Sequence, residues 1–443
     1  MPYKGRRAFM SERVPKAERH RRRREIFAWT LYDFANTAFS VIVVTVVYAV
    51  YFKKYIVGDL KLDFLGLNRN PGDLLWGFGG ALSMFLVAVS SPVLGAIADY
   101  SSRKKRFLFV YSMVCILATI SLYFLSAGMI WQGMLLFIIG DVGFEGAIVF
   151  YNGFLPQISH EDNIGKISGY GFALGYVGSL VSLLIAMPYA NQAFIHNDLS
   201  LMRPAFIWAG LFFFVFSLPI YIMLNETKNP VRETGAFIKT GYERVRKTLR
   251  KIRRFPQITR FLISYFVYID GVNTVIYFSG IYASDTLGFS MKEVIQFFAI
   301  VQASAISGSY VFGYLTDKLG PKKTIHLTLL MWMLVTIGGF LARDALTFYV
   351  VGLVAGMAMG SSQSASRALM GRLIPAGMEA EFFGFYALTG KFSAIMGPLL
   401  FGLTSTVTGN QRYAVLSVLV FFVAGFLLLR RVDERVTYKD VVL

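Results

Sequence analysis

The stretch Asp33-Phe34-Ala35-Asn36-Thr37 lies within an apolar segment near the start of the chain. Its polar pattern recurs past the middle as Asp270-Gly271-Val272-Asn273-Thr274, again within an apolar segment. A carboxylate within a membrane helix is costly unless it faces a partner or a water-filled cavity. The duplication therefore predicts a two-fold-repeated membrane protein with a polar central pathway.

The composition of the 443-residue chain also indicates a membrane protein. Hydrophobic residues make up 55%, charged residues only 16%, and the mean hydropathy is +0.55. Apolar runs of about 20 residues match the length of a helix that crosses ~30 Å of hydrocarbon. About twelve such runs occur, over residues 26–52, 74–98, 107–127, 131–156, 167–189, 204–224, 260–283, 293–315, 324–342, 345–371, 381–406 and 412–430.

The placement of charge predicts the orientation. Most of the 44 Lys and Arg residues fall in the two tails and in the loops after even-numbered spans. By the positive-inside rule, both termini are expected in the cytoplasm. The net charge of +18 is therefore interpreted as topology and contact with anionic lipid, in preference to nucleic-acid binding by the Arg21–Arg24 run.

Several classes of chemistry are not expected. The sole cysteine, Cys115, lies in the third apolar run, and four scattered histidines form no ligand cluster, so the sequence predicts neither a disulfide framework nor a metal site. No GxxxxGK[ST] loop is present for ATP hydrolysis. We expect no cofactor and no enzymatic activity.

The most basic loop divides the chain. Within it, apolar residues recur at about 3.5-residue spacing among Lys and Arg, which predicts an amphipathic helix on the membrane surface, with a solvated linker as the alternative. We expect a basic cytoplasmic tail over 1–25, an N-terminal six-helix bundle over 26–224, a basic cytoplasmic linker over 225–259, a C-terminal six-helix bundle over 260–430 and a cytoplasmic tail over 431–443.

A second duplicated motif defines the repeat. Gly95 and Asp99 close the second span and precede Arg103, whereas Gly313 and Asp317 close the eighth, about 218 residues later. Near-constant offsets predict a parallel duplication of six helices, the architecture of the major facilitator superfamily. The motif resembles the loop signature of that superfamily. These five residues are expected to latch the cytoplasmic ends of the bundles during conformational cycling.

Further phrases narrow the resemblance. They are Trp29-Thr-Leu-Tyr-Asp-Phe-Ala-Asn-Thr-Ala-Phe39, Phe150-Tyr-Asn-Gly-Phe-Leu-Pro156, Gln363-Ser-Ala-Ser-Arg367 and Phe382-Phe-Gly-Phe-Tyr-Ala-Leu-Thr-Gly-Lys391. Together they resemble the "unknown major facilitator" family, whose better-known relatives are the autophagy-related vacuolar amino-acid effluxers of fungi. The resemblance covers about residues 26 to 430 and implies efflux of amino acids or similar metabolites. The short loops favour a bacterial inner-membrane protein.

Two polar stripes are candidates for the substrate pathway. Asp33, Asn36 and Thr37 share one helical face, and so do Asp270, Asn273 and Thr274. In a facilitator fold the first and seventh helices line the central cavity, so facing stripes could bind a polar solute. The alternative is that each aspartate pairs with a neighbouring helix and has a structural role.

The fourth span supplies Asp141, Glu145 and Asn152 from one face. Two carboxylates one turn apart repel when both are ionised, so a proton-sharing pair is one hypothesis. Lys391, ten residues into span eleven, could neutralise an acid or meet a substrate carboxylate; the alternative is a locking salt bridge.

The tenth span adds a further polar stripe. Gln363 joins the candidate pathway. Arg367, one turn further on, lies near the cytoplasmic end of its span and is expected to snorkel to the interface.

The sequence thus predicts an all-α membrane protein of about twelve transmembrane helices in two pseudo-symmetric bundles. We expect it to be a secondary transporter for a small-molecule substrate, working by alternating access as a monomer in the lipid bilayer, with protons as the candidate coupling ion. Amino-acid-like efflux is the preferred direction and substrate class. Uptake of a small polar nutrient, or a non-transporting membrane sensor or anchor, are the alternatives.

Overall fold

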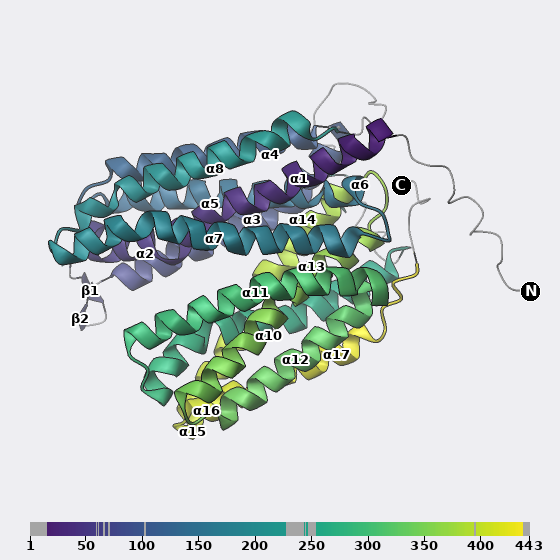
Figure 1. Ribbon diagram of the computed structural model, residues 1–443. Helices are drawn as coiled ribbons and strands as arrows, with labels where there is room; N and C mark the ends of the chain where they lie inside the picture. Colours follow the sequence, from purple (N-terminus) through teal and green to yellow (C-terminus); the bar gives the residue numbers. More distant parts are fainter. Residues whose placement is uncertain are drawn as a thin grey trace, which may run out of the picture.

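A computed structural model of the protein describes residues 16–58, 60, 62–64, 67–69, 71–101, 103–226, 243, 245–246, 254–393 and 396–436. Twelve helical segments in these ranges are long and apolar enough to cross a membrane. The predicted fold class is confirmed, because nearly all of the described chain is helical and the helices form two bundles (Figure 1). The predicted surface helix within 225–259 lies almost entirely outside the described residues.

The first half contains spans one to six. A short antiparallel hairpin, in which Leu62 pairs with Arg69, follows the first span. The elements are α1 (Lys16–Phe39), π-helical Ser40–Thr45, α2 (Val47–Tyr51), π-helical Phe52–Ile56, β1 (Leu62–Phe64), β2 (Leu67–Arg69), α3 (Gly72–Ser101), α4 (Lys104–Ser121), a 3-10 turn (Leu122–Phe124), α5 (Ile130–Asn152), α6 (Leu155–Ile158), α7 (Ile164–Ile195), a 3-10 turn (Leu199–Met202) and α8 (Pro204–Met223).

The second half repeats the arrangement. Span eleven, predicted as one helix over 381–406, is described as α14 and α15 on either side of residues 394–395, which lie outside the described residues. The elements are α10 (Pro256–Leu287), α11 (Met291–Leu319), α12 (Pro321–Leu341), α13 (Ala345–Leu373), α14 (Glu379–Phe392), α15 (Met396–Thr408), α16 (Gln411–Ser417) and α17 (Leu419–Leu429).

Helix boundaries follow the sequence locally. Ser290 and Glu293 form a capping box at the start of α11, and the Asp344 carboxylate accepts from the Thr347 amide at the start of α13. By contrast, α1 begins at Lys16, well before the predicted span at residue 26, because Lys, Arg and Glu are good helix formers outside the membrane as well.

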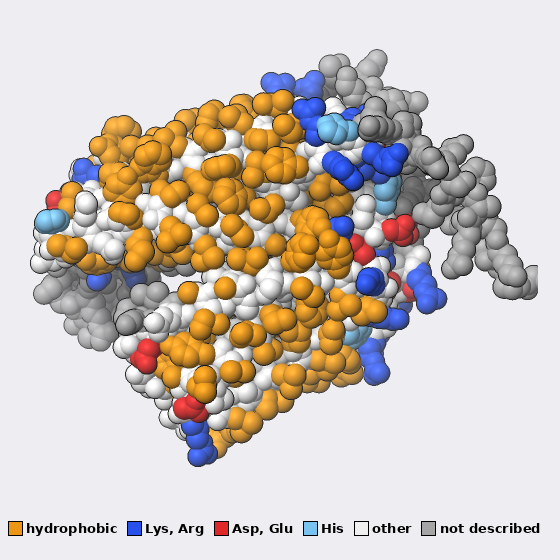
Figure 2. Space-filling view, viewed as in Figure 1, with side chains coloured by type: hydrophobic (Ala, Val, Ile, Leu, Met, Phe, Trp, Pro, Cys, Tyr) orange, Lys and Arg blue, Asp and Glu red, His pale blue; other side chains and the backbone are white. Residues whose placement is uncertain are grey.

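Each bundle has its own apolar core. The first is built around Trp29, Tyr32 and Tyr151, and the second around Trp332 and Phe422, whose rings stack. The outer faces of the helices are covered by exposed hydrophobic side chains, as Figure 2 shows. This distribution is the one expected when lipid, and not water, surrounds the protein.

The two bundles meet along two seams, α3 with α14 and α7 with α11. We call the end of the molecule at which α1 begins and residues 431–436 lie the terminal end; the bundles converge there and diverge toward the opposite end (Figure 1). At the first seam Gly95 is required by close approach, because a Cβ added to it would lie 2.2 Å from the carbonyl oxygen of Ala380. Lys and Arg side chains gather at the same end (Figure 2).

The Gly95 contact makes a testable prediction. Gly95→Ala is expected to open the α3–α14 seam, since overpacking costs about 1–3 kcal/mol and a shift of about 1.4 kcal/mol is tenfold in an equilibrium. In a Cys115→Ala background, a Ser91→Cys reporter at this seam should react about tenfold faster with a water-soluble thiol reagent. Gly77→Ala is the matched control. Gly77 lies on the same helix, and a Cβ added to it would have no neighbouring atom within 4 Å. Equal reactivity in both variants would contradict the prediction.

Candidate functional site

A cavity of about 680 Å³ lies between the two bundles. It extends from Asp33 and Arg367 toward Tyr282 and Phe348, which lie near the opposite end. Neither Asp99 nor Asp317 lines it. Toward the terminal end, where the bundles converge (Figure 1), the cavity ends at the level of Asp33 and Arg367. Of the residues predicted from the sequence, those that line it are Asp33, Asn36, Thr37, Glu145, Asn152, Asn273, Gln363 and Lys391.

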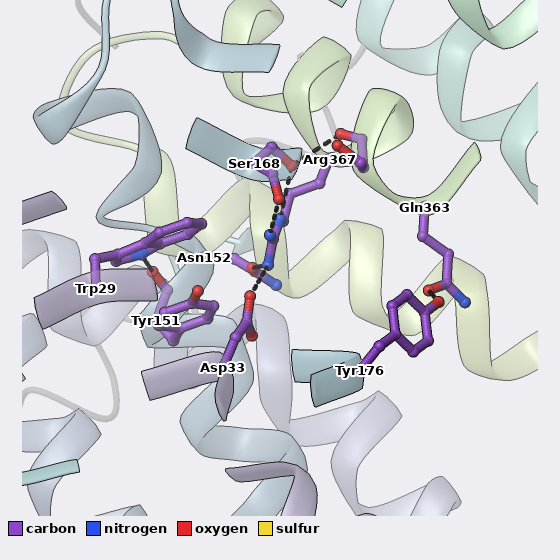
Figure 3. Close-up of polar contacts among 9 residues, drawn as sticks. Trp29, Asp33, Tyr151, Asn152, Ser168, Tyr176, Gln363 and Arg367 are labelled. Atoms are coloured by element: carbon purple, nitrogen blue, oxygen red, sulfur yellow. Dashed lines mark hydrogen bonds and ion pairs between the residues drawn. The ribbon is translucent and has the colours of Figure 1, made fainter. Parts of the chain in front are cut away.

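A buried ion pair closes the base of the cavity. The Arg367 side chain on α13 crosses from the C-terminal bundle into the N-terminal one, where its Nη1 lies 3.0 Å from Asp33 Oδ2 on α1 (Figure 3). Its Nε donates to Ser168 Oγ at 3.0 Å and its Nη2 to the Ser168 carbonyl at 2.7 Å. Arg367 is only 3% exposed, so the predicted snorkelling to the interface is wrong.

Aromatic rings complete the Arg367 environment. The guanidinium carbon lies 4.8 Å from the Trp29 ring centroid and 4.0 Å from that of Phe172, and cations over aromatic faces are attracted by the ring quadrupole. Gly171 leaves the space that the ion pair occupies, because a Cβ there would lie 2.4 Å from Asp33 Oδ2. The N-terminal bundle is thus shaped to receive this one side chain.

Polar groups continue along the cavity wall beyond the ion pair. Tyr176 on α7 donates to Gln363 Oε1 at 2.8 Å, a second contact between the bundles (Figure 3). The Asn152 amide oxygen lies 3.4 Å from Arg367 Nη1. The Asn36 side-chain nitrogen is buried and has no hydrogen-bond partner among the described residues. An unpaired buried donor in a cavity wall is suited to meet a polar ligand.

A second ion pair crosses the cavity. Lys391 on α14 pairs with Glu145 on α5, again joining a cation of the C-terminal bundle to an acid of the N-terminal one. Asp141, one turn away, is 1% exposed and does not line the cavity; it accepts from Ser83 Oγ on α3 at 2.5 Å. The two carboxylates of span four therefore have different partners in this structure.

The second duplicated aspartate lies in different surroundings from the first. Asp270 is 1% exposed, and both of its carboxylate oxygens accept from the Gly397 amide at the start of α15, at 3.0 and 2.9 Å. Thr274 donates to the Asp270 carbonyl. Neither residue lines the cavity, whereas Asn273 does. The α10 stripe thus turns its carboxylate toward the first residues of α15.

The motif aspartates bridge the bundles at the terminal end. Asp99 Oδ2 accepts from the Glu381 amide in the first turn of α14 at 2.9 Å, and Asp317 accepts from the Gly165 and Lys166 amides in the first turn of α7 at 2.8 and 3.0 Å. Each carboxylate meets a helix N-terminus, where negative charge is favoured. Gly313 packs directly against α7, near Gly165 and Gly169.

The cation beside Asp99 is not the one named from the sequence. Lys104 lies 3.3 Å from Asp99 and 2.9 Å from Glu379 of the other bundle, and it is buried. Arg103 is exposed just before α4. Among the described residues, no cluster of His, Cys, Asp and Glu could hold a metal ion.

From the sequence, Arg367 was placed at the interface because depth was estimated along a single helix. Arg367 follows Gln363 by one turn on the same face. That spacing indicates that Arg367 faces the cavity as Gln363 does. Because Asp33 has no basic residue near it on its own helix face, the sequence also indicated that its partner must come from another helix.

Comparison with known proteins identifies the family. The family described as "Vacuole effluxer Atg22 like" matches residues 75–441. The chain belongs to this family. A Bacillus subtilis protein named "Uncharacterized MFS-type transporter YxiO" is 30% identical over 94% of this chain and 96% of its own length. "Autophagy-related protein 22" of Kluyveromyces lactis is 25% identical over 91% of this chain and 92% of its own length.

Solved structures agree on the fold. The proton:xylose symporter XylE superposes with a TM-score of 0.70 at 14% identity, covering 95% of this chain and 96% of its own. The transporter FucP in the outward conformation gives 0.68 at 12% identity, covering 93% of this chain and 98% of its own. This member of the Atg22-like family is therefore a multi-pass transporter of the major facilitator type, and its relatives are transporters, not enzymes.

The Asp33–Arg367 pair makes a prediction about stability. Arg367→Gln leaves the Asp33 carboxylate buried without its cation, and breaking one side of a buried pair costs about 3–5 kcal/mol. The unfolding temperature of the purified protein should fall accordingly. The double variant Asp33→Asn/Arg367→Gln should lose less than the sum of the two single variants.

A control separates this effect from a general loss of charge. Arg343→Gln removes an exposed arginine just before the same helix and is expected to leave the unfolding temperature unchanged. Additive losses in the Asp33–Arg367 cycle would show that the two side chains are not energetically coupled.

Proposed function

We propose that this chain is a secondary transporter that exports a small zwitterionic metabolite of the amino-acid type by alternating access. The observation that carries the proposal is the division of charge across the cavity. The acids, Asp33 and Glu145, belong to the N-terminal bundle, and the cations, Arg367 and Lys391, to the C-terminal bundle. A ligand with one carboxylate and one ammonium group can engage a cation from one bundle and an acid from the other.

The rest of the wall supports a small ligand with a variable side chain. Asn36, Asn152, Asn273 and Gln363 supply amide donors and acceptors, while most of the remaining lining is apolar. Pockets of this kind, apolar with a few placed polar groups, are typical of small-molecule sites. The description "vacuole effluxer" of the family supports export over uptake.

Alternating access needs contacts that form in one state and break in another. We assign this role to the terminal-end bridges formed by Asp99 and Asp317 with the first turns of α14 and α7. Gly95 and Gly313 allow the close approach on which these bridges depend. The latch proposed from the sequence thus has a specific form, in which each carboxylate accepts from backbone amides of the opposite bundle.

The orientation follows from charge. The gathering of Lys and Arg at the terminal end supports a cytoplasmic location for that end (Figure 2). The similarity to a Bacillus subtilis transporter supports the inner membrane of a bacterium. In this orientation the cavity extends toward the outside, as expected for the state that releases an exported substrate.

Proton coupling is proposed through span four. Protonation of Glu145 would release Lys391, and Asp141, one turn away and bonded to Ser83, is the neighbouring acid that can exchange the proton. The substrate carboxylate could then take the place of Glu145 beside Lys391. In this scheme, binding of the proton and of the substrate is linked through one lysine.

Ligand binding can be tested without knowing the direction of transport. The unfolding temperature of the purified protein should rise with free amino acids, because a ligand at 100 times its Kd stabilises the folded state by about 2.7 kcal/mol. The same compounds with the amine acetylated or the carboxyl esterified should give smaller shifts. Lys391→Gln should abolish the response, whereas Lys54→Gln, at an exposed residue outside the cavity, should retain it.

If the acetylated or esterified compounds raise the unfolding temperature as much as the free amino acids do, the zwitterion proposal is wrong. Absence of any response would contradict free amino acids as the substrate class.

Coupling has its own test in proteoliposomes. Asp141→Asn should abolish substrate accumulation driven by a pH gradient but leave substrate exchange at equal pH intact. Asp162→Asn, at an exposed loop position, is the matched control. If Asp141→Asn still accumulates substrate against its gradient, span four does not carry the proton.

A further inference from the structure

A second cavity, of about 670 Å³, lies at the terminal end on the outside of the C-terminal bundle. It is formed by the start of α12, the end of α17 and residues 433–435. Nothing in the transport mechanism above uses it. Its chemistry is different from that of the central cavity, because four of its lining residues are Lys322, Lys323, Arg430 and Arg435.

The chain after α17 is held firmly enough to form a wall of this cavity. Glu434 Oε2 accepts from the Lys322 amide at 2.8 Å, and the Asp433 amide donates to Gln257 Oε1 at 2.9 Å. Lys322 Nζ donates to the Arg430 carbonyl at 2.9 Å. Residues 430–434 are therefore tied to both α12 and α10.

The positive charge of the cavity is not neutralised by its acids. Glu434 is occupied by the first turn of α12, and Asp433 accepts from the Arg435 amide. Lys323, Arg430 and Arg435 are exposed, and in the described part of the chain none of them has a carboxylate within ion-pair distance. A cluster of this kind attracts anions.

The first repeat has a related lysine contact but different neighbouring side chains at this position. Lys105 Nζ donates to the Leu224 carbonyl at 2.8 Å, as Lys322 does to that of Arg430. At the equivalent positions, Arg430 thus replaces an apolar Leu224. By the same offset as the two lysines, His326 replaces Phe109. The second repeat therefore has Arg430 and His326 where the first has Leu224 and Phe109, whereas Lys322 and Lys323 correspond to the basic residues Lys105 and Arg106.

The part of the cavity farther from the terminal end is apolar. Leu327 and Leu330 lie one and two turns beyond Lys323 on α12, are 38% and 45% exposed, and line the cavity together with Phe426. A free phosphate would use only the cationic part. A ligand with a phosphate and an acyl chain would use both, with its chain running along α12 into the bilayer.

We propose that this cavity binds an anionic phospholipid, with its phosphate between Lys323, Arg430 and Arg435 and an acyl chain against Leu327 and Leu330. Basic side chains at the membrane surface each add to binding of anionic lipid. The bound lipid would hold the terminal ends of α12 and α17 together. This site is independent of the transported substrate.

The test uses the full-length protein, purified in detergent and depleted of lipid. Phosphatidylglycerol is expected to raise the unfolding temperature, whereas phosphatidylcholine with the same chains and inorganic phosphate should not. Lys323→Gln/Arg430→Gln should weaken the phosphatidylglycerol midpoint about tenfold. The control Arg19→Gln/Arg23→Gln removes two exposed charges from the same end of the molecule and should leave the midpoint unchanged.

A second measurement counts the lipid directly. Mass spectrometry of the intact protein should show one retained phosphatidylglycerol in the wild type and less in the Lys323→Gln/Arg430→Gln variant. An equal midpoint and equal retention in the two proteins would overturn the site. An equal shift with inorganic phosphate would overturn the lipid as its occupant in favour of a soluble anion.

Discussion

The ion pair between Asp33 and Arg367 is the interaction on which the closed arrangement depends. A guanidinium in the interior of a membrane protein is stable only if its charge and its donors are satisfied. Here the partners are Asp33, Ser168 and Asn152, from three helices of the opposite bundle, with aromatic rings over the remaining faces. Separating the bundles at this level must break these contacts or replace them with others.

The other contacts between the bundles lie at successive depths along the same interface. Backbone amides of α7 and α14 meet Asp317 and Asp99 at the terminal end, Arg367 lies deeper, and Lys391 crosses the cavity beyond it. In the two deeper pairs the acid comes from the N-terminal half and the base from the C-terminal half. The bundles therefore attract each other across the cavity, and a ligand that carries both charges can compensate for their separation.

The sequence repeat does not produce a repeat of function. Asp33 and Asp270 occupy matching positions, yet Asp33 pairs with an arginine of the other bundle, whereas Asp270 accepts from the Gly397 amide near the start of α15. The same contrast holds at the end of each half, where Leu224 in the first corresponds to Arg430 in the second. The two halves share their helix arrangement, but the side chains at matching positions make different contacts.

The sequence by itself determined the fold, the number of spans and the family, because hydrocarbon thickness, helical periodicity and the repeat offset are properties of contiguous residues. Most of the pathway residues that it indicated do line the cavity, since a polar stripe on a membrane helix is too costly to face lipid and must turn inward. Only the tertiary structure decided partners: Arg367 with Asp33, Lys391 with Glu145, Asp141 with Ser83 and Lys104 with Asp99. Each of these pairs joins different helices, and the depth and direction of a side chain relative to another helix depend on how whole helices pack, which no local pattern encodes.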